Sequence, residues 1–157
     1  KDFKVAYIVD ENDKFITLIE VDPKGLFDGV AVFRTDDVCS FRVHSLYINK
    51  LGKKILGDTI YTQGMNIIER VKEFSFKGFA RALQNSKTLV EVDFINGNGI
   101  TGRILGYEGE KLAVDEFDQH EAVSTGRSFS DFAGISGFVV DAQYMRKIVK
   151  SLTEKNI

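Results

Sequence analysis

The sequence contains little of what several classes of protein require. Its 157 residues include one cysteine, one proline and no tryptophan. Cys39 stands alone, which excludes an intrachain disulfide, and its apolar surroundings in residues 38–41 predict a buried, unreactive thiol. No apolar run approaches the roughly 20 residues of a membrane span, and no signal peptide is recognisable. We therefore expect a cytoplasmic protein with no membrane partner.

An excess of charge of either sign is also absent. The chain has 21 basic and 23 acidic residues, for a net charge of −2. Because binding to a phosphate backbone grows with the number of phosphates neutralised, this balance argues against a protein that coats DNA or RNA. Hydrophobic residues make up 43 % and charged residues 28 %, which is typical of a folded domain. Phenylalanine, present 13 times, supplies buried area for a small core.

Short β-strand patterns separated by turns fill most of the chain. The turns are rich in Asp, Asn, Gly and Pro, as at residues 22–25 and 96–99. The strands predicted between them are residues 5–9, 15–21, 29–34, 38–43, 89–94, 100–107, 111–117 and 135–140. Residues 118–133 are predicted to form a polar loop. Such meanders must close or pack to bury their edges, which favours small β-barrels.

Helical patterns are fewer and shorter. Ser45 and Ser75 are placed to cap helices, and apolar residues 76, 79, 80 and 83 form a stripe at helical spacing. Residues 66–73 indicate a helical turn or two, and residues 142–152 a closing helix.

A single offset relates the two parts of the chain. Phe41, Tyr47 and Leu51 have counterparts 97 residues later in Phe138, Tyr144 and Ile148. We interpret this as a duplication. The predicted fold is mainly β with short helices, as two tandem SH3/Sm-like antiparallel β-barrels, each followed by a helix. The predicted parts are a first barrel in residues 1–56, a helical connector in 57–88 whose last helix opens the second barrel, and a second barrel with its helix in 89–157.

The second part resembles the Sm-like superfamily, which includes the bacterial Sm-like RNA chaperone, over about residues 75–117. A short helix precedes the first strand, as in that family. The first Sm motif, an Asn-Gly pair followed by alternating apolar residues and Gly and then an aromatic and an acid, is matched by Asn96, Gly97, Ile100, Gly102, Ile104, Tyr107 and Glu108. Gly102 is expected to let the strand bend without a clashing Cβ.

The functional positions of that family match less well. The RNA-reading Asn of its eukaryotic members is Leu112 here, and the Arg-Gly pair of the second motif is replaced by Ser136-Gly137. The resemblance therefore implies the fold more than an RNA site. The first part resembles strand-rich modules of uncharacterised bacterial proteins, and this resemblance implies no activity.

Residues with catalytic or metal-binding potential are scattered. His44 closes a predicted strand, and His120 lies in an acidic loop, where a metal site is the less favoured alternative to a solvated surface. The pattern Gly97-x-Gly99-x-x-Gly102 begins in a hairpin and is followed by no helix, so it does not predict a dinucleotide site. We expect neither a cofactor nor a catalytic constellation.

Five residues are the candidate ligand contacts. Arg103 and Tyr107 are expected at the rim of the second barrel, where a phosphate contact and base stacking are conceivable. Glu108 and Lys111 flank the next turn, and Arg127 lies in a flexible segment able to grip a phosphate.

These observations predict a non-enzymatic binding or regulatory module whose partner is another protein, because edges and grooves of small barrels accept extended peptides. The first alternative is an Sm-like RNA-binding protein. A weaker alternative is an enzyme with a site in the loop 118–133 that contains His120, Glu121 and Arg127. The oligomeric state stays open.

Overall fold

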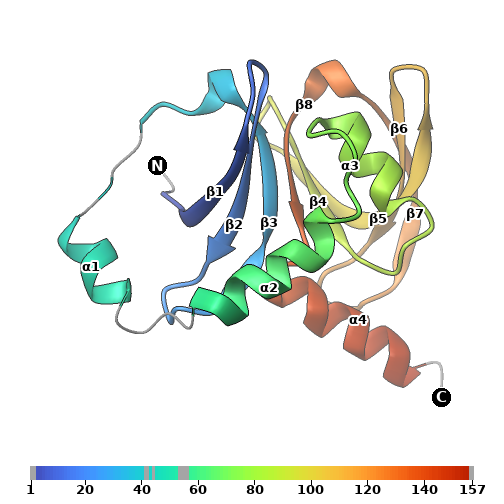
Figure 1. Ribbon diagram of the computed structural model, residues 1–157. Coiled ribbons are helices and arrows are strands. Elements are labelled where there is room, and N and C mark those ends of the chain that lie inside the picture. The colour runs from blue at the N-terminus through green and yellow to red at the C-terminus, as the bar shows by residue number, and fades with distance from the viewer. Residues whose placement is uncertain (1–2, 41–42, 44, 53–56, 156–157) are drawn as a thin grey trace.

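The computed structural model describes the chain except for residues 1–2, 41–42, 44, 53–56 and 156–157. Eight antiparallel strands form one sheet in the order β1-β2-β3-β8-β4-β5-β6-β7 (Figure 1). The strands are β1 (Val5–Glu11), β2 (Phe15–Val21), β3 (Phe27–Arg34), β4 (Val90–Phe94), β5 (Gly99–Glu108), β6 (Lys111–Phe117), β7 (Ser124–Asp131) and β8 (Ile135–Val140).

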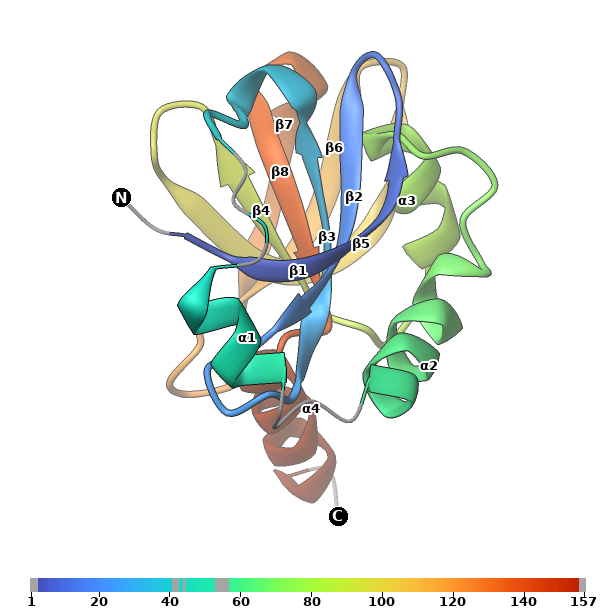
Figure 2. The ribbon, with the colours of Figure 1, turned by 60° about the vertical axis from the view of Figure 1, so that its left-hand side comes forward.

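Four helices and two 3-10 turns connect the strands. They are α1 (Leu46–Gly52), α2 (Gly57–Ile68), α3 (Phe76–Leu83), α4 (Gln143–Lys155), η1 (Thr35–Asp37) and η2 (Phe132–Gly134). In the turned view, α2 and α3 run along one side of the sheet and α4 lies at its lower end (Figure 2). The Ser75 hydroxyl accepts a hydrogen bond from the Gly78 amide at 3.0 Å, so the predicted cap of α3 is confirmed.

Alternating residues of the central strands bury side chains on both faces of the sheet. Val30 and Val32 of β3 belong to a cluster that α2 and α3 cover, whereas Ala31 belongs to a second cluster that α4 covers. In β8, Phe138 and Val139 divide in the same way. We call these the first and the second face. Both faces of the central strands are therefore packed.

The prediction of a mainly antiparallel β protein with short helices is confirmed. Strand β3 pairs with β8 through the register Val30↔Val140 to Phe33↔Gly137, so early and late parts of the chain share one sheet. The pairing order leaves this sheet open, with β1 and β7 at its two edges. Two separate barrels are not confirmed by this arrangement.

Several local predictions fail where the strand pattern was ambiguous. Within the predicted strand 38–43, residues 38–40 and 43 are not in a strand, and 41–42 lie outside the described residues. Cys39 is exposed, so the prediction of a buried thiol is wrong: its segment packs in no sheet. The polar loop predicted for residues 118–133 is wrong in large part, because it contains β7 and η2. The helix predicted at residues 66–73 instead ends at Ile68, as the last turn of α2.

Gly102 lies at a close approach of β5 and β6, and the register shift in this pair lies between Ile104 and Gly106. A Cβ at this position would lie 2.2 Å from the carbonyl oxygen of Asp115 on β6 and 2.7 Å from a methyl group of Val114. Ile104 and Val114 are buried. The absence of a side chain at Gly102 lets β5 and β6 approach closely.

Candidate functional site

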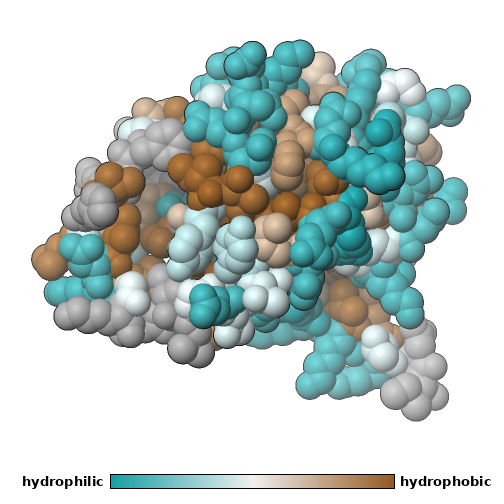
Figure 3. Space-filling view, in the orientation of Figure 1, coloured by the Kyte–Doolittle hydropathy of each residue, from teal (hydrophilic) through white to brown (hydrophobic). Residues whose placement is uncertain are grey.

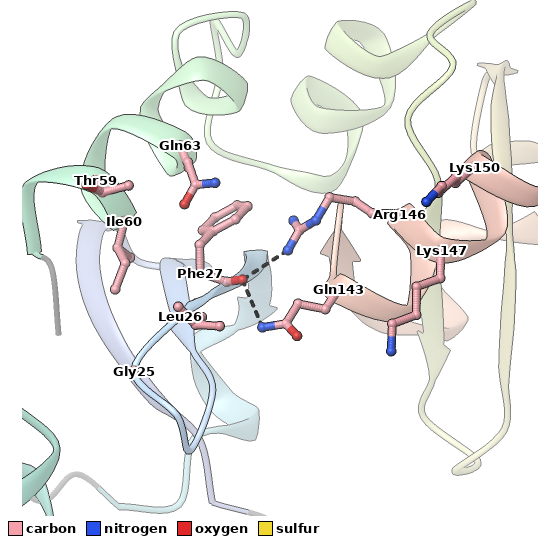
Figure 4. Close-up of a pocket in the computed structure, with 10 residues that line it drawn as sticks. All are labelled: Gly25, Leu26, Phe27, Thr59, Ile60, Gln63, Gln143, Arg146, Lys147 and Lys150. Carbon is pink, nitrogen blue, oxygen red and sulfur yellow. Dashed lines mark hydrogen bonds between the residues drawn. The ribbon is translucent and has the colours of Figure 1, made fainter. Parts of the chain in front are cut away.

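An open cleft of about 440 Å³ lies between α2, α4 and the start of β3 (Figure 4). We call it the α2–α4 cleft. It is lined by Gly25, Leu26, Phe27, Thr59, Ile60, Gln63, Gln143, Arg146, Lys147 and Lys150. Its volume lies within the usual range of ligand pockets, roughly 300–1,000 Å³. It brings together residues from both ends of the chain.

The turn between β2 and β3 forms one wall of the cleft and is fixed by a single carboxylate. Asp22 Oδ1 accepts hydrogen bonds from the amides of Lys24 and Leu26, both at 2.8 Å, and Oδ2 accepts one from the Gln143 side chain at 2.7 Å. Burial opposes ionisation of Asp22, but the backbone bond from Leu26 and the Gln143 bond outweigh it and lower the pKa. The wall is thus held rigid by an ionised side chain.

Helix α4 forms the opposite wall and is anchored to β3. The Asp28 carboxylate accepts a hydrogen bond from the Gln143 amide at 3.0 Å, which satisfies a free N–H at the start of α4. Gly29 has φ +107°, and a Cβ there would lie 2.6 Å from the carbonyl oxygen of Val140. A glycine is required at this close approach.

Arg146 crosses the cleft but is already engaged within the protein. Its guanidinium donates to the carbonyl oxygens of Asp141 at 2.6 Å and Phe27 at 3.1 Å, and it lies over the Phe27 ring (Figure 4). It also pairs with the Asp141 carboxylate at 3.5 Å. Burial raises the pKa of Asp141 against the opposing effect of Arg146. Arg146 therefore shapes the cleft more than it offers a free charge.

Lys147 and Lys150 supply the free positive charge. Both side chains are exposed, and within the part of the chain that the structure describes neither has an ion pair or a side-chain hydrogen bond. Sequence reasoning did not select them. The spacing of these two lysines and Arg146 along one face of a predicted helix was the only pattern that pointed to them. The β2–β3 turn and α2, which complete the cleft, are distant in sequence.

Three of the five predicted contact residues, Tyr107, Glu108 and Lys111, line a second cleft of about 530 Å³ beside α3. We call it the α3–β5 cleft, and Gln84, Leu105, Gly106, Ala113 and Phe129 complete its lining. Lys111 forms an exposed ion pair with Asp131 at 3.1 Å. Exposed pairs of this kind contribute little to stability.

Arg103 and Tyr107 are not brought together. Arg103 pairs in register with Asp115, and Tyr107 pairs with Leu112, which lies on the first face. A bulge between Ile104 and Gly106 shifts the alternation by one residue, so the two side chains point to opposite faces. Without that bulge, the even spacing would have placed them on the same face.

The Tyr107 ring is surrounded by the protein's own side chains. It packs edge-on against Phe132, with ring centroids 5.4 Å apart, and Arg81 donates a hydrogen bond to its hydroxyl at 2.5 Å. The Lys77 ammonium lies 5.9 Å from the ring centroid. These contacts occupy the ring that base stacking would require. Arg103 similarly lies over the Phe117 ring, 5.1 Å from its centroid.

Only the start of the segment proposed for an enzyme site, residues 118–123, forms a turn. Asp118 accepts hydrogen bonds from the amides of His120 and Glu121, and these bonds lower the pKa of its carboxyl. Arg127 lies apart from them on the exposed strand β7. In the described ranges no group of three His, Cys, Asp or Glu residues is placed to hold a metal ion. His44 lies outside those ranges.

An acidic cluster lies on the second face. It consists of Glu20 on β2 and Glu91 and Asp93 on β4, and Lys4 pairs with Glu20 at 2.7 Å. Burial and the neighbouring Glu91 raise the pKa of Asp93 to about 6. The Tyr144 hydroxyl of α4 donates to Glu91, and burial raises the pKa of this tyrosine.

Exposed hydrophobic side chains gather beside α1, on the left of Figure 3. They include Phe3, Val43, Leu46 and Tyr47, and the rings of Phe3 and Tyr47 pack edge-on. The side over β6 is mostly hydrophilic (Figure 3).

No family model, curated protein or solved structure matches this chain. No helix among the described residues is long and apolar enough to cross a membrane.

Proposed function

We propose that the protein is a non-enzymatic binding module whose α2–α4 cleft accepts an extended segment of another protein that carries carboxylates and an apolar side chain. The observation that supports this most directly is the pairing of two unengaged cations, Lys147 and Lys150, with the apolar side chains of Leu26 and Ile60 in one cleft.

The two kinds of lining have separate roles. Leu26 is about half exposed, so an incoming apolar side chain would remove its surface from water, whereas Ile60 is already buried and gives the cleft an apolar base. Lys147 and Lys150 would attract carboxylates, raise the association rate and set the orientation of the segment. The Gln63 amide, exposed on α2, is a hydrogen-bonding group for its backbone.

Both walls of the α2–α4 cleft are held in place before a partner binds, which favours binding. Asp22 fixes the turn that carries Leu26, and Asp28 fixes the start of α4. A site built in advance avoids the entropy cost of ordering its walls when the partner arrives.

A peptide titration tests the proposal. The probe is a fluorescein-labelled twelve-residue peptide of Glu, Leu and Ser, compared with the same peptide with Lys in place of Glu. We expect binding of the Glu peptide only, weakened at least tenfold in K147E/K150E. The matched control is K72E/K87E, which reverses two exposed lysines outside the cleft and makes the same change in net charge.

Two results would overturn the proposal: equal binding of both peptides, or equal weakening by both double variants. The RNA-binding alternative is tested in the same format with short single-stranded RNA at low and moderate salt. Because Arg103 and Tyr107 face opposite ways, no stacking and phosphate pair supports that alternative.

We also propose that the chain has a duplicated, Sm-like architecture. It is supported by element bounds that recur at the 97-residue offset: β3 (27–34) corresponds to β7 (124–131), and η1 (35–37) to η2 (132–134). Helices α1 and α4 begin at positions 46 and 143, which have the same separation. This alignment matches β1 with β5.

A further inference from the structure

We propose that strand β7 is a homodimerisation edge, on which a second copy of this chain pairs antiparallel about a two-fold axis at Phe129. The proposal is independent of the α2–α4 cleft. It rests on the unpaired edge, on its counterpart in the first half of the chain and on the pattern of side chains along it.

Strand β7 ends the sheet at the right of Figure 1. It pairs with β6 without interruption from Lys111↔Asp131 to Glu116↔Gly126, so the pairing of this stretch is regular. Its other edge pairs with no strand among the described residues. Residues 127–131 contain no proline and no bulge, the usual features that prevent edge pairing.

The corresponding edge in the first half of the chain is paired. Strand β3 uses Val30 to Phe33 to bind β8. At the 97-residue offset, these positions correspond to Arg127 to Ser130 of β7. In β3, this segment accepts a neighbouring strand on the edge that faces away from β2. In β7, the corresponding edge, which faces away from β6, pairs with no strand among the described residues.

Self-pairing has few allowed registers. A two-fold axis normal to the sheet keeps the same face of both copies on the same side. Odd-numbered residues of one copy must therefore lie opposite odd-numbered residues of the other, and even-numbered residues opposite even-numbered ones. An axis at Phe129 places Arg127 opposite Asp131 of the second copy, twice, and Phe129 opposite itself. An axis at Arg127 would oppose two like charges, and an axis at Ser128 or Ser130 would pair neither the charges nor the rings.

The side chains suit the Phe129 register. Phe129 is 67 % exposed, an unusual position for a large apolar side chain, and the two rings would bury each other. Arg127 has no ion pair among the described residues, and Asp131 forms only the exposed pair with Lys111. On the opposite side of the strand, the Ser128 hydroxyl is buried without a hydrogen-bond partner and would lie opposite Ser130 of the second copy.

The other edge of the sheet is less suitable. Strand β1 pairs with β2 through a bulge between Ile8 and Asp10, and it ends in two acidic residues, Asp10 and Glu11. A bulge twists an edge away from regular pairing, and like charges repel across a two-fold axis. This contrast favours β7.

Analytical ultracentrifugation of the full chain tests the proposal. The protein concentration runs from about 10 to about 500 μM, the range in which a small interface is expected to associate. We expect a concentration-dependent dimer whose Kd rises at least about tenfold in R127D and in D131R, because each change opposes like charges twice. The double variant R127D/D131R restores opposite charges and should restore the dimer. K14D, on the exposed β1–β2 turn, is the matched control and should leave the Kd unchanged.

A second variant, F129S, removes the central ring and should also shift the equilibrium to monomer. Circular dichroism of each variant checks that the fold is retained. A wild type that is monomeric at 500 μM would overturn the proposal, as would a dimer that resists both single charge reversals. A double variant that stays monomeric would overturn the Phe129 register.

Discussion

The Asp28 carboxylate on β3 accepts a hydrogen bond from the backbone amide of Gln143, 115 residues later, at 3.0 Å. This bond joins the first half of the chain to the first turn of α4. The negative charge also lies where the helix dipole is positive. One side chain thus caps the helix and positions the cations of the α2–α4 cleft.

Replacement of Asp28 by alanine should therefore destabilise the protein by about 1 kcal/mol, the usual cost of losing a helix cap. Urea denaturation measures the change. The matched control D13A removes an exposed carboxylate on the β1–β2 turn and should change stability by less than about 0.5 kcal/mol. If D28A and D13A have the same midpoint, Asp28 does not anchor α4.

Replacement of Gly102 by alanine should cost about 1–3 kcal/mol, because the new methyl group would overlap the Asp115 carbonyl oxygen on β6. Gly134 provides the control, since a Cβ there has no neighbour within 4 Å. Thermal unfolding of G102A and G134A separates the two cases. An unchanged melting temperature for G102A would mean that β5 and β6 can separate at little cost.

Strands rich in apolar residues could be predicted from the sequence, whereas a strand with few apolar residues could not. Seven of the eight strands carried the expected pattern in whole or part, and the exception is β7, whose residues include four exposed positions in succession from Ser124. An edge strand buries little, so its sequence need not alternate. The opposite error arose at Val38, where an apolar run outside the sheet resembled a strand.

The candidate site was harder to predict than the fold. Lys147 and Lys150 belong to a cleft only because Asp22 and Asp28, more than 100 residues earlier, hold the facing turn and helix. The even spacing of Arg103 and Tyr107 would place both on one face of a regular strand, but the bulge at Leu105 separates them. Tertiary contacts and bulges of this kind leave no local pattern in a single sequence.

The Lys4–Glu20 pair predicts a stability effect that depends on pH. The Glu20 side chain is 8 % exposed, and burial raises its pKa while Lys4 opposes the rise. In K4M the carboxylate would lose its charged partner, so the variant should be destabilised by about 1–3 kcal/mol at pH 8. At pH 4 the loss of stability should be smaller, because a protonated, neutral Glu20 forms no ion pair that the replacement of Lys4 could break. Urea midpoints at both pH values test this, and an equal loss at both would contradict it.

Asp93 gives the clearest pH dependence. Burial and the adjacent Glu91 raise its pKa from 3.8 to about 6 in the folded protein. The folded state therefore binds this proton more tightly than the unfolded state, so the contribution of Asp93 to stability is greatest below about pH 4 and falls as the pH rises to about 6. In D93N the amide cannot ionise beside Glu91, and this decline should disappear.

Chemical denaturation of the wild type and D93N between pH 4 and pH 8 measures the difference. D93N should be the more stable protein at pH 8, and the gap should close as the pH falls towards 4. D115N is the matched control, because it makes the same change on β6, where Asp115 lies opposite Arg127 in the β6–β7 register and accepts a hydrogen bond from the Ser124 hydroxyl. A constant gap across the range would show that Asp93 is ionised throughout and that the cluster of Glu20, Glu91 and Asp93 tolerates its full charge.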